Sequence, residues 1–420
     1  MILLSSQIVL TLAAVLVFTT IVLLLVILLL FVKHKFIPET TVEIDINGGK
    51  KQIVTPTGFS LLATLGNNNV YLPSACGGGA TCGMCKCQVL LGGGSMLPTE
   101  QGFFSRKQQQ ADWRLGCQVK VRENIELFVP EEVLGVKKWE CEVVSNRNVA
   151  TFIKEFVVAL PKGETLNFKS GGYIQIDVPP CEVDFAKDID VEKTYRKDWD
   201  AMGLWALKMK NHEPTTRAYS MANHPEEGNK IMLNVRIATP PYDKAKGGFA
   251  NVNAGVCSSY LYSRKAGDKV TLSGPYGEFF LRDTQNEMMF IGGGAGMAPM
   301  RSHIFHLFHT LKTGRKVTFW YGARSRKEIF YEDDFKQIAA TFPNFKFVIA
   351  LSDAQVEDKW TGATGFIHQV IYEQYLRDHA APEDIEYYLC GPPMMTDAAT
   401  KMLSDLGVPN EMVMYDNFGA

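Results

Sequence analysis

The stretch MMFIGGGAGMAPMRS, residues 288–302, decides the fold of the C-terminal third of the chain. An apolar run ends there in glycines, and a helix-like stretch follows, with Pro299 suited to its first turn. Similar apolar runs, KVTFWYGA, FKFVIALS and IEYYLCG, alternate with further helix-like stretches. This alternation predicts an α/β domain with a doubly wound parallel sheet over residues 285–420.

Two different patterns precede this domain. Over residues 131–284, alternating runs such as YIQIDVP and IMLNVRIA are separated by turn residues, which predicts an antiparallel β-barrel. Residues 36–130 are rich in glycine and contain short β-prone runs such as TVEIDI, which predicts a small α+β domain. The chain is therefore expected to be multidomain.

The N-terminal residues form a different kind of segment. Ile8 to Val32 is an apolar run broken only by three threonines, and the first 32 residues carry no charge. Roughly 20 apolar residues suffice to span a bilayer. A cleaved signal peptide is the alternative, but its basic n-region, shorter apolar stretch and small-residue cleavage site are missing. We expect a single transmembrane helix over residues 8–32, and Lys33-His34-Lys35 predicts that the soluble domains face the cytoplasm.

Composition excludes some partners and draws attention to the cysteines. Lysine and arginine number 43 and the acids 45, a net charge of -2, so no nucleic acid is expected as a partner. Nine cysteines in a large chain expected to face the cytoplasm argue against a disulfide framework. They favour metal or redox use of some of the thiols.

Four cysteines have the spacing C-x5-C-x2-C plus a distant fourth, in PSACGGGATCGMC (residues 73–85) and RLGCQV (residues 114–119). Three thiolates on one tight loop can wrap an iron-sulfur cluster. A structural zinc site is the alternative, but it usually uses two C-x2-C pairs, and the fourth cysteine here has no such partner. The pattern resembles [2Fe-2S] ferredoxins, although the loop is one residue longer than the plant type. The predicted ligands are Cys76, Cys82, Cys85 and Cys117, and Cys87 is not assigned.

Two motifs in the barrel region, RAYSMANHP (residues 217–225) and NAGVCSSYL (residues 253–261), carry residue types that a flavin needs. A flavin requires a cation for its pyrophosphate, a flat aromatic against its ring and a donor near N5. Arg217, Tyr219 and Ser220 supply all three, although an ordinary strand remains the alternative. The second motif is a Gly-x-x-Ser turn whose N–H groups suit phosphate. This turn consists of Gly255, Val256, Cys257 and Ser258.

With SGPYGEFFL (residues 273–281), these motifs closely resemble the ferredoxin-NADP reductase superfamily over residues 139–420. The resemblance implies that Arg217 contacts the pyrophosphate, Tyr219 stacks on the ring, and Ser220 lies by N5 as a catalytic residue. It also implies FAD, whereas the residues alone leave FMN open.

The glycine-rich stretch quoted first is also the candidate nicotinamide site. Glycines let a pyrophosphate approach the start of a helix, but Pro299 stands where a third Rossmann glycine would fall, so a plain turn is the alternative. The reductase family has this variant together with a late Cys-Gly-Pro. The expected contacts are Gly293, Gly294, Gly296, Cys390, Gly391 and Pro392.

The resemblance further implies that Cys390 lies near nicotinamide C4 as a catalytic residue, although it could be a buried, inert cysteine. Phe418 could cover the flavin or simply pack. Arg324, Arg326 and Lys327 follow the second strand, where NADPH enzymes place cations, so NADH or NADPH stays open.

Two features have no assigned function. Residues 181–216, with Trp199 and Trp205, form an insertion that is either a docking surface or a lid over the flavin. His303, His306 and His309 are interpreted as helix-surface packing rather than metal ligands.

The order of anchor, ferredoxin, barrel and nicotinamide lobe resembles the F-subunit family of the Na+-translocating NADH:quinone oxidoreductases over essentially the full length. This implies NADH oxidation by FAD, with single electrons leaving through a [2Fe-2S] cluster to other membrane subunits of that complex and finally to ubiquinone, at the bacterial inner membrane. A membrane-bound reductase that feeds an oxygenase or desaturase, and a non-catalytic electron carrier, are the alternatives.

Overall fold

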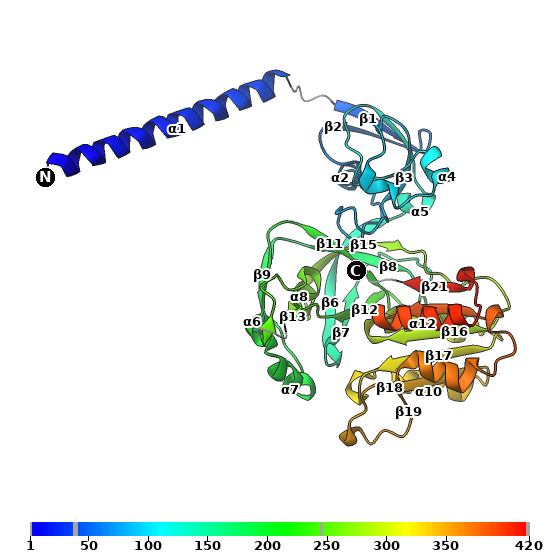
Figure 1. Cartoon of the computed structure of the whole chain (residues 1–420). Helices are drawn as coiled ribbons and strands as arrows, with labels where there is room; N and C mark the ends of the chain where they lie inside the picture. Colours follow the sequence, from blue (N-terminus) through cyan, green and yellow to red (C-terminus); the bar gives the residue numbers. More distant parts are fainter. Residues whose placement is uncertain (1, 37–40, 244–246, 417–420) are drawn as a thin grey trace. The chain divides into compact units, whose positions relative to one another are not determined.

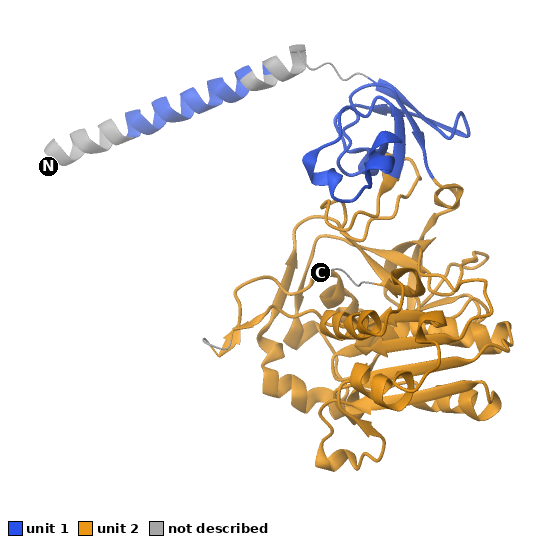
Figure 2. Ribbon diagram, turned by 45° about the vertical axis from the view of Figure 1, so that its right-hand side comes forward, with its two compact units in different colours: residues 1–64, 87–129 blue, residues 65–86, 130–420 orange. Residues whose placement is uncertain are grey.

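The computed structural model describes residues 2–36, 41–243 and 247–416. They form two compact units, residues 1–64 with 87–129 and residues 65–86 with 130–420 (Figure 2). The cysteine loop, residues 65–86, thus groups with the second unit, although the sequence places it in the ferredoxin-like domain.

Helix α1 (Ile2–Phe36) is continuous and contains neither glycine nor proline, the two residues that most disfavour a helix interior. It covers the predicted span of residues 8–32, and its large apolar side chains between Leu12 and Leu28 are exposed. Within the described part of the chain, no helix has the combined length and apolar character needed to cross a membrane.

The first unit is built on a five-stranded sheet in the order β2-β1-β5-β3-β4. In β1, alternate residues Val42, Ile44 and Ile46 are buried, as expected of a strand with one face on a core. A buried ion pair between Arg114 and Glu100 (2.7 Å) supports the strand that leads to Cys117. The strands are β1 (Thr41–Ile46), β2 (Lys51–Pro56), β3 (Lys86–Leu91), β4 (Trp113–Leu115) and β5 (Ile125–Phe128), and the helices are α2 (Leu61–Asn67), α3 (Pro98–Gln101) and α4 (Arg106–Gln110).

The second unit begins with the predicted antiparallel barrel, six strands in the order β11-β8-β15-β6-β7-β12. Its edge strands meet, because Met221 bridges to Leu233 and the Ala222 N–H donates to the Met232 carbonyl oxygen at 2.7 Å. The barrel prediction is therefore confirmed. The strands are β6 (Lys137–Ala150), β7 (Ile153–Ala159), β8 (Tyr173–Val178), β11 (Thr215–Ser220), β12 (Lys230–Arg236) and β15 (Lys269–Tyr276), flanked by α5 (Glu131–Leu134), α8 (Val256–Ser263), β13 (Tyr242–Asp243) and β14 (Gly248–Phe249).

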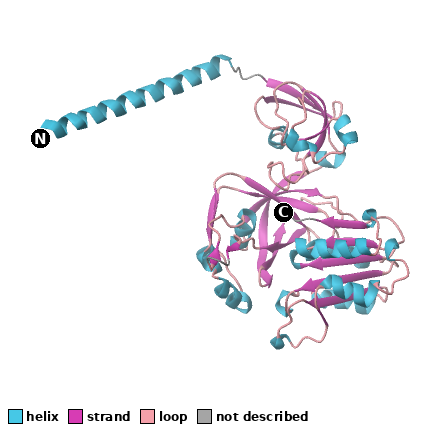
Figure 3. Cartoon of the chain, viewed as in Figure 1, coloured by secondary structure: helices cyan, strands magenta, loops and turns pink. Residues whose placement is uncertain are grey.

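The C-terminal lobe is the predicted doubly wound sheet, with parallel strands in the order β19-β18-β17-β16-β20-β21. Helices α9 and α10 pack on one face and α11 and α12 on the other (Figure 1, Figure 3). The strands are β16 (Met288–Gly293), β17 (Val317–Ala323), β18 (Phe345–Leu351), β19 (Ala363–Thr364), β20 (Glu386–Cys390) and β21 (Val413–Asp416). The helices are α9 (Met297–Phe305), α10 (Glu332–Thr341), α11 (Ile367–Ile371) and α12 (Pro393–Asp405).

Candidate functional site

The cysteine loop brings two of its predicted ligands together. The sulfurs of Cys76 and Cys82 lie 3.3 Å apart. Gly77 has a φ of +66°, and a Cβ there would meet a guanidinium nitrogen of Arg217 and the carbonyl oxygen of Thr216, each at 3.3 Å. The loop therefore packs against β11, and a side chain at position 77 would strain the turn and push the loop away.

The backbone of this loop favours a thiolate at Cys76. Burial alone would raise the pKa of Cys76, but N–H groups of Thr81, Cys82 and Gly78 donate to its sulfur and lower the pKa to about 6. Burial raises the pKa of Cys82. The thiolate is the form that ligates iron, and N–H groups directed at sulfur stabilise it, so these residues fit an iron-sulfur cluster.

The other two predicted ligands are buried cysteines, and Cys117 belongs to the first unit. Among the described residues, no three or more histidine, cysteine or carboxylate side chains form a group that could hold a metal ion. The four-cysteine ligand set stays a prediction from spacing. Cys87 is fully buried in β3, and burial raises its pKa to about 12.

Strand β11 carries the three residues predicted to contact the flavin. Arg217 is exposed and donates from Nη1 to the Thr216 carbonyl oxygen at 2.8 Å. Tyr219 is half-buried, and Ser220, the last residue of the strand, is buried. An exposed guanidinium, an aromatic ring and a hydroxyl on one strand are the groups that FAD requires.

The turn before α8 is suited to bind an anion at the N-terminus of the helix. A Cβ on Gly255 would lie 2.5 Å from the Ala238 Cβ, so only glycine fits there. The Ser258 hydroxyl accepts from the Ala238 N–H at 3.1 Å and donates to the Gly255 carbonyl oxygen at 3.2 Å, so it fixes the turn. The N–H groups of Val256, buried Cys257 and Ser258, in the first turn, lack partners within the helix and are suited to phosphate.

Ser220, Cys390 and Asp416 meet where β11, β20 and β21 end. The Ser220 hydroxyl donates to Asp416 Oδ2 at 2.6 Å, and Cys390 is paired in register with Asp416. Burial raises the pKa of both Cys390 and Asp416, so the thiol stays neutral. Sequence reasoning missed Asp416, whose one signal is an acid at the end of the last strand. Phe418 lies outside the described residues.

The glycine turn after β16 packs against the Cys-Gly-Pro turn after β20. A Cβ on Gly296 would lie 2.1 Å from the Cys390 carbonyl oxygen, and one on Gly293 would lie 2.7 Å from the Met395 sulfur. The two motifs therefore form one surface at the carboxyl edge of the sheet, where dinucleotides bind in such folds. It contains the predicted contacts Gly293, Gly294, Gly296, Cys390, Gly391 and Pro392.

The prediction that His303 lies on the surface of its helix is wrong. The ring is fully buried, and its Nδ1 lies 3.2 Å from the Ser170 hydroxyl of the barrel. Every residue of α9 is buried, because the helix lies between the parallel sheet and the barrel. Burial lowers the pKa of His303 to about 3, so the imidazole is neutral.

Part of the insertion of residues 181–216 packs into the barrel core. Trp199 is fully buried, its indole N–H donates to the Thr151 carbonyl oxygen at 2.8 Å, and its ring lies 5.9 Å from that of Tyr262. Trp199 is therefore unavailable as a docking residue. The insertion comprises β9 (Cys181–Asp184), α6 (Phe185–Asp188), α7 (Lys193–Met202), η1 (Leu204–Ala206) and β10 (Lys208–Asn211).

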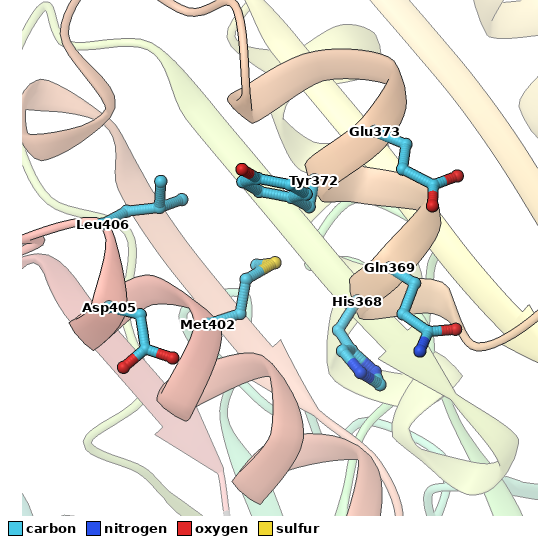
Figure 4. A pocket seen from close by; sticks show the side chains of 7 residues that line it. All are labelled: His368, Gln369, Tyr372, Glu373, Met402, Asp405 and Leu406. Atoms are coloured by element: carbon cyan, nitrogen blue, oxygen red, sulfur yellow. The ribbon is translucent and has the colours of Figure 1, made fainter.

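A cavity of about 410 Å³ lies away from these residues. Figure 4 shows side chains from α11 and its continuation on one side, and from the end of α12 on the other. None of the predicted site residues lines it. The lining residues are His368, Gln369, Tyr372, Glu373, Met402, Asp405 and Leu406.

Three family models match the chain in the order in which these parts occur. Residues 44–122 match the 2Fe-2S iron-sulfur cluster binding domain, residues 204–281 the oxidoreductase FAD-binding domain, and residues 290–401 the oxidoreductase NAD-binding domain. The chain therefore has a [2Fe-2S], an FAD and an NAD domain.

Solved structures share this architecture at low identity. The Amycolatopsis cytochrome P450 reductase GcoB aligns with a TM-score of 0.61 at 22% identity, over 90% of this chain and 99% of its own. A ferredoxin reductase in carbazole 1,9a-dioxygenase aligns with a TM-score of 0.57 at 24% identity, over 90% and 98%. At such identity these two structures support the fold alone.

Curated relatives are far more similar. The F subunit of the Na+-translocating NADH-quinone reductase of Methylococcus capsulatus is 56% identical over 93% of this chain and 94% of its own length. The F subunit of the same reductase in Neisseria meningitidis serogroup B is 54% identical over 93% and 95%. The chain belongs to the family formed by the F subunits of the Na+-translocating NADH-quinone reductases.

Proposed function

We propose that this chain is the electron-input subunit of a respiratory Na+-translocating NADH:quinone oxidoreductase. It oxidises NADH at the C-terminal lobe, transfers hydride to FAD in the barrel, and releases single electrons from a [2Fe-2S] cluster to other membrane subunits and finally to quinone. The observation that carries this electron order is the packing of the cysteine loop directly against the flavin strand, with Gly77 beside Arg217.

The barrel is proposed to bind FAD, and the C-terminal lobe is proposed to bind the nicotinamide coenzyme. Arg217 and the first turn of α8 would hold the pyrophosphate of FAD, and Tyr219 would lie against its ring. The glycine turn and the Cys-Gly-Pro turn hold the nicotinamide coenzyme at the adjoining sheet edge. When bound, FAD accepts an electron pair as hydride and gives electrons up singly, which the cluster requires.

Ser220, Asp416 and Cys390 organise the hydride step. Asp416 accepts the Ser220 hydrogen bond and so fixes the direction of the hydroxyl, which is proposed to lie by N5. Cys390 is buried and neutral, so its small thiol excludes water beside nicotinamide C4 without adding a charge there. These residues would thereby help to align the two coenzymes for hydride transfer.

Contact between the loop and the strand supports direct electron transfer. Tyr71 and Met84 of the loop pack on Tyr173 and Tyr276 of the barrel, and Ala218 of the flavin strand belongs to the same cluster. Lys138 of the barrel lies 5.7 Å from the centre of the Tyr71 ring. This packing places the loop that carries Cys76, Cys82 and Cys85 beside the flavin strand, within one unit.

Helix α1 is proposed to anchor the chain in the bacterial inner membrane, with the other domains in the cytoplasm. Support comes from the uncharged run of residues 8–32, the exposed apolar side chains between Leu12 and Leu28, and the basic residues that follow.

Membranes from cells with and without this chain test the function. Sodium-stimulated quinone reduction by NADH is expected in the former and should be lost on deletion, and the intact chain should restore it. No loss on deletion would favour a reductase that feeds an oxygenase or desaturase. A fragment without residues 1–35 should still have its FAD reduced rapidly by NADH, whereas a non-catalytic carrier would show no such reduction.

A further inference from the structure

The loop after β17 carries three cationic side chains. In dinucleotide-binding folds, this loop distinguishes NADH from NADPH. Strand β17 is parallel to β16, and Gly322 is paired with Gly293, so the loop starts at the same sheet edge as the glycine turn. In dinucleotide-binding folds, an acid near this position binds the ribose 2′-hydroxyl of NADH, and an arginine accommodates the 2′-phosphate of NADPH. Arg324, Arg326 and Lys327 on their own would suit NADPH.

Each of these cations already has an acidic partner. Arg324 Nε lies 3.1 Å from Asp353 Oδ2, and Lys327 Nζ lies 3.0 Å from Asp198 Oδ2. Arg326 makes a longer contact of 3.9 Å with Glu332. Asp353 is itself held, because the Gln355 side chain donates to its Oδ1 at 2.9 Å. The cations are therefore balanced before any coenzyme arrives.

The insertion holds Asp198 in place. The neighbouring Trp199 is fully buried and donates to the Thr151 carbonyl oxygen at 2.8 Å. The Thr151 hydroxyl is hydrogen-bonded to Glu328, the residue next to Lys327. The residue next to each member of the exposed ion pair, Trp199 and Glu328, is thus held by a hydrogen bond to Thr151. An exposed pair contributes little to stability in general, but one whose ends are fixed can control the charge at its position.

We propose that Asp198 and Asp353 are specificity residues that select NADH over NADPH. The inference rests on the proposed function and deepens it by assigning a task to the insertion. A 2′-phosphate carries nearly two negative charges, and it would have to approach these carboxylates to reach the cations that they hold. The 2′-hydroxyl of NADH is uncharged and can donate to a carboxylate.

Kinetic constants of the full chain for both coenzymes test the proposal, with variants Asp198→Asn, Asp353→Asn and the double variant. Each single change should raise kcat/KM for NADPH about tenfold, because a like charge leaves and a cation becomes free. The value for NADH should change less. Asp405→Asn is the matched control, since Asp405 pairs with Lys401 at 2.9 Å on α12, outside this loop. An unchanged ratio in the double variant, or an equal gain for NADH, would overturn the proposal.

Calorimetry separates this inference from the proposed function, because it needs no catalysis. The double variant should bind 2′,5′-ADP more tightly than the unaltered chain does, with 5′-ADP binding unchanged. Tight 2′,5′-ADP binding by the unaltered chain would overturn the inference. If NADH fails to reduce FAD while the contrast between the two ADP ligands holds, the proposed function is wrong and the specificity assignment stands.

Discussion

Cys76 in the cysteine loop and Cys390 at the sheet edge are both cysteines at predicted redox sites, yet the structure gives them opposite chemistry. Backbone N–H groups lower the pKa of Cys76 to about 6, despite partial burial. Cys390 has no exposed surface, and burial raises its pKa. Backbone donors thus favour the thiolate form that a metal ligand needs, whereas desolvation keeps the thiol of Cys390 neutral.

The variant Cys76→Ala has the largest expected effect, because it removes the thiol of the cysteine loop and leaves Cys390 unaltered. Onward electron transfer and the EPR signal of the cluster should be abolished, because a predicted ligand is lost. FAD reduction by NADH should persist, because the proposed hydride site lies on other strands. Stopped-flow absorbance and EPR measure the two halves. Loss of FAD reduction in a folded variant would mean that our electron order is wrong.

A second change tests whether the first unit supports Cys117 through its buried ion pair. Glu100 is completely buried, and it accepts from Arg114 and from the Leu115 N–H at 2.9 Å. Glu100→Gln should lower the free energy of unfolding by about 3–5 kcal/mol, because it leaves the Arg114 charge uncompensated. Chemical denaturation measures the loss. Replacement of exposed Glu123 is the control, and an equal effect there would contradict the argument.

On the hydride side, Asp416→Ala should slow FAD reduction by about 10²-fold, because Ser220 loses the acceptor that orients it. Asp416→Asn keeps an acceptor oxygen and should restore most of the rate. Stopped-flow measurement with NADH and with its C4-deuterated form checks both variants. Unchanged rates and isotope effect in the alanine variant would remove Asp416 from the hydride step.

The effect that is smallest at neutral pH concerns the same desolvation at His303. Its native pKa of about 3 lies below the ordinary 6.5, so the unfolded chain binds the proton more readily. Stability from this group is complete above pH 6.5 and falls by about 1.4 kcal/mol per pH unit below it. His303→Asn should flatten the acid limb of denaturation curves, whereas substitution of exposed His212 should not. If the acid limb is equally steep with and without His303, this histidine is not the cause of the loss of stability in acid.

The two regions also differ in how much the sequence reveals. The spacing of Cys76, Cys82 and Cys85 points to a cluster because neighbouring ligands must come from one short loop. Alternating runs separated by turn residues likewise predicted the barrel, and apolar strands that alternate with helix-like stretches predicted the doubly wound sheet. Ser220 and Asp416 are 196 positions apart, and no local pattern connects them.

Burial was the second property that local patterns did not reveal. Trp199 lies in a charged insertion and reads as surface, but tertiary packing places it in the barrel core. His303 was assigned to the helix surface, although α9 is covered on both sides. In both cases, the periodicity of a segment shows which of its own faces is apolar but not what packs against that face.

The electron path is tested most directly by rapid mixing of the intact chain with NADH, followed by optical recording of FAD and freeze-quench EPR of the cluster. We predict that FAD bleaches first, and that the cluster signal then rises at a rate set by the preceding hydride step. A cluster signal that appears before FAD is reduced, or in chain stripped of FAD, would contradict the account.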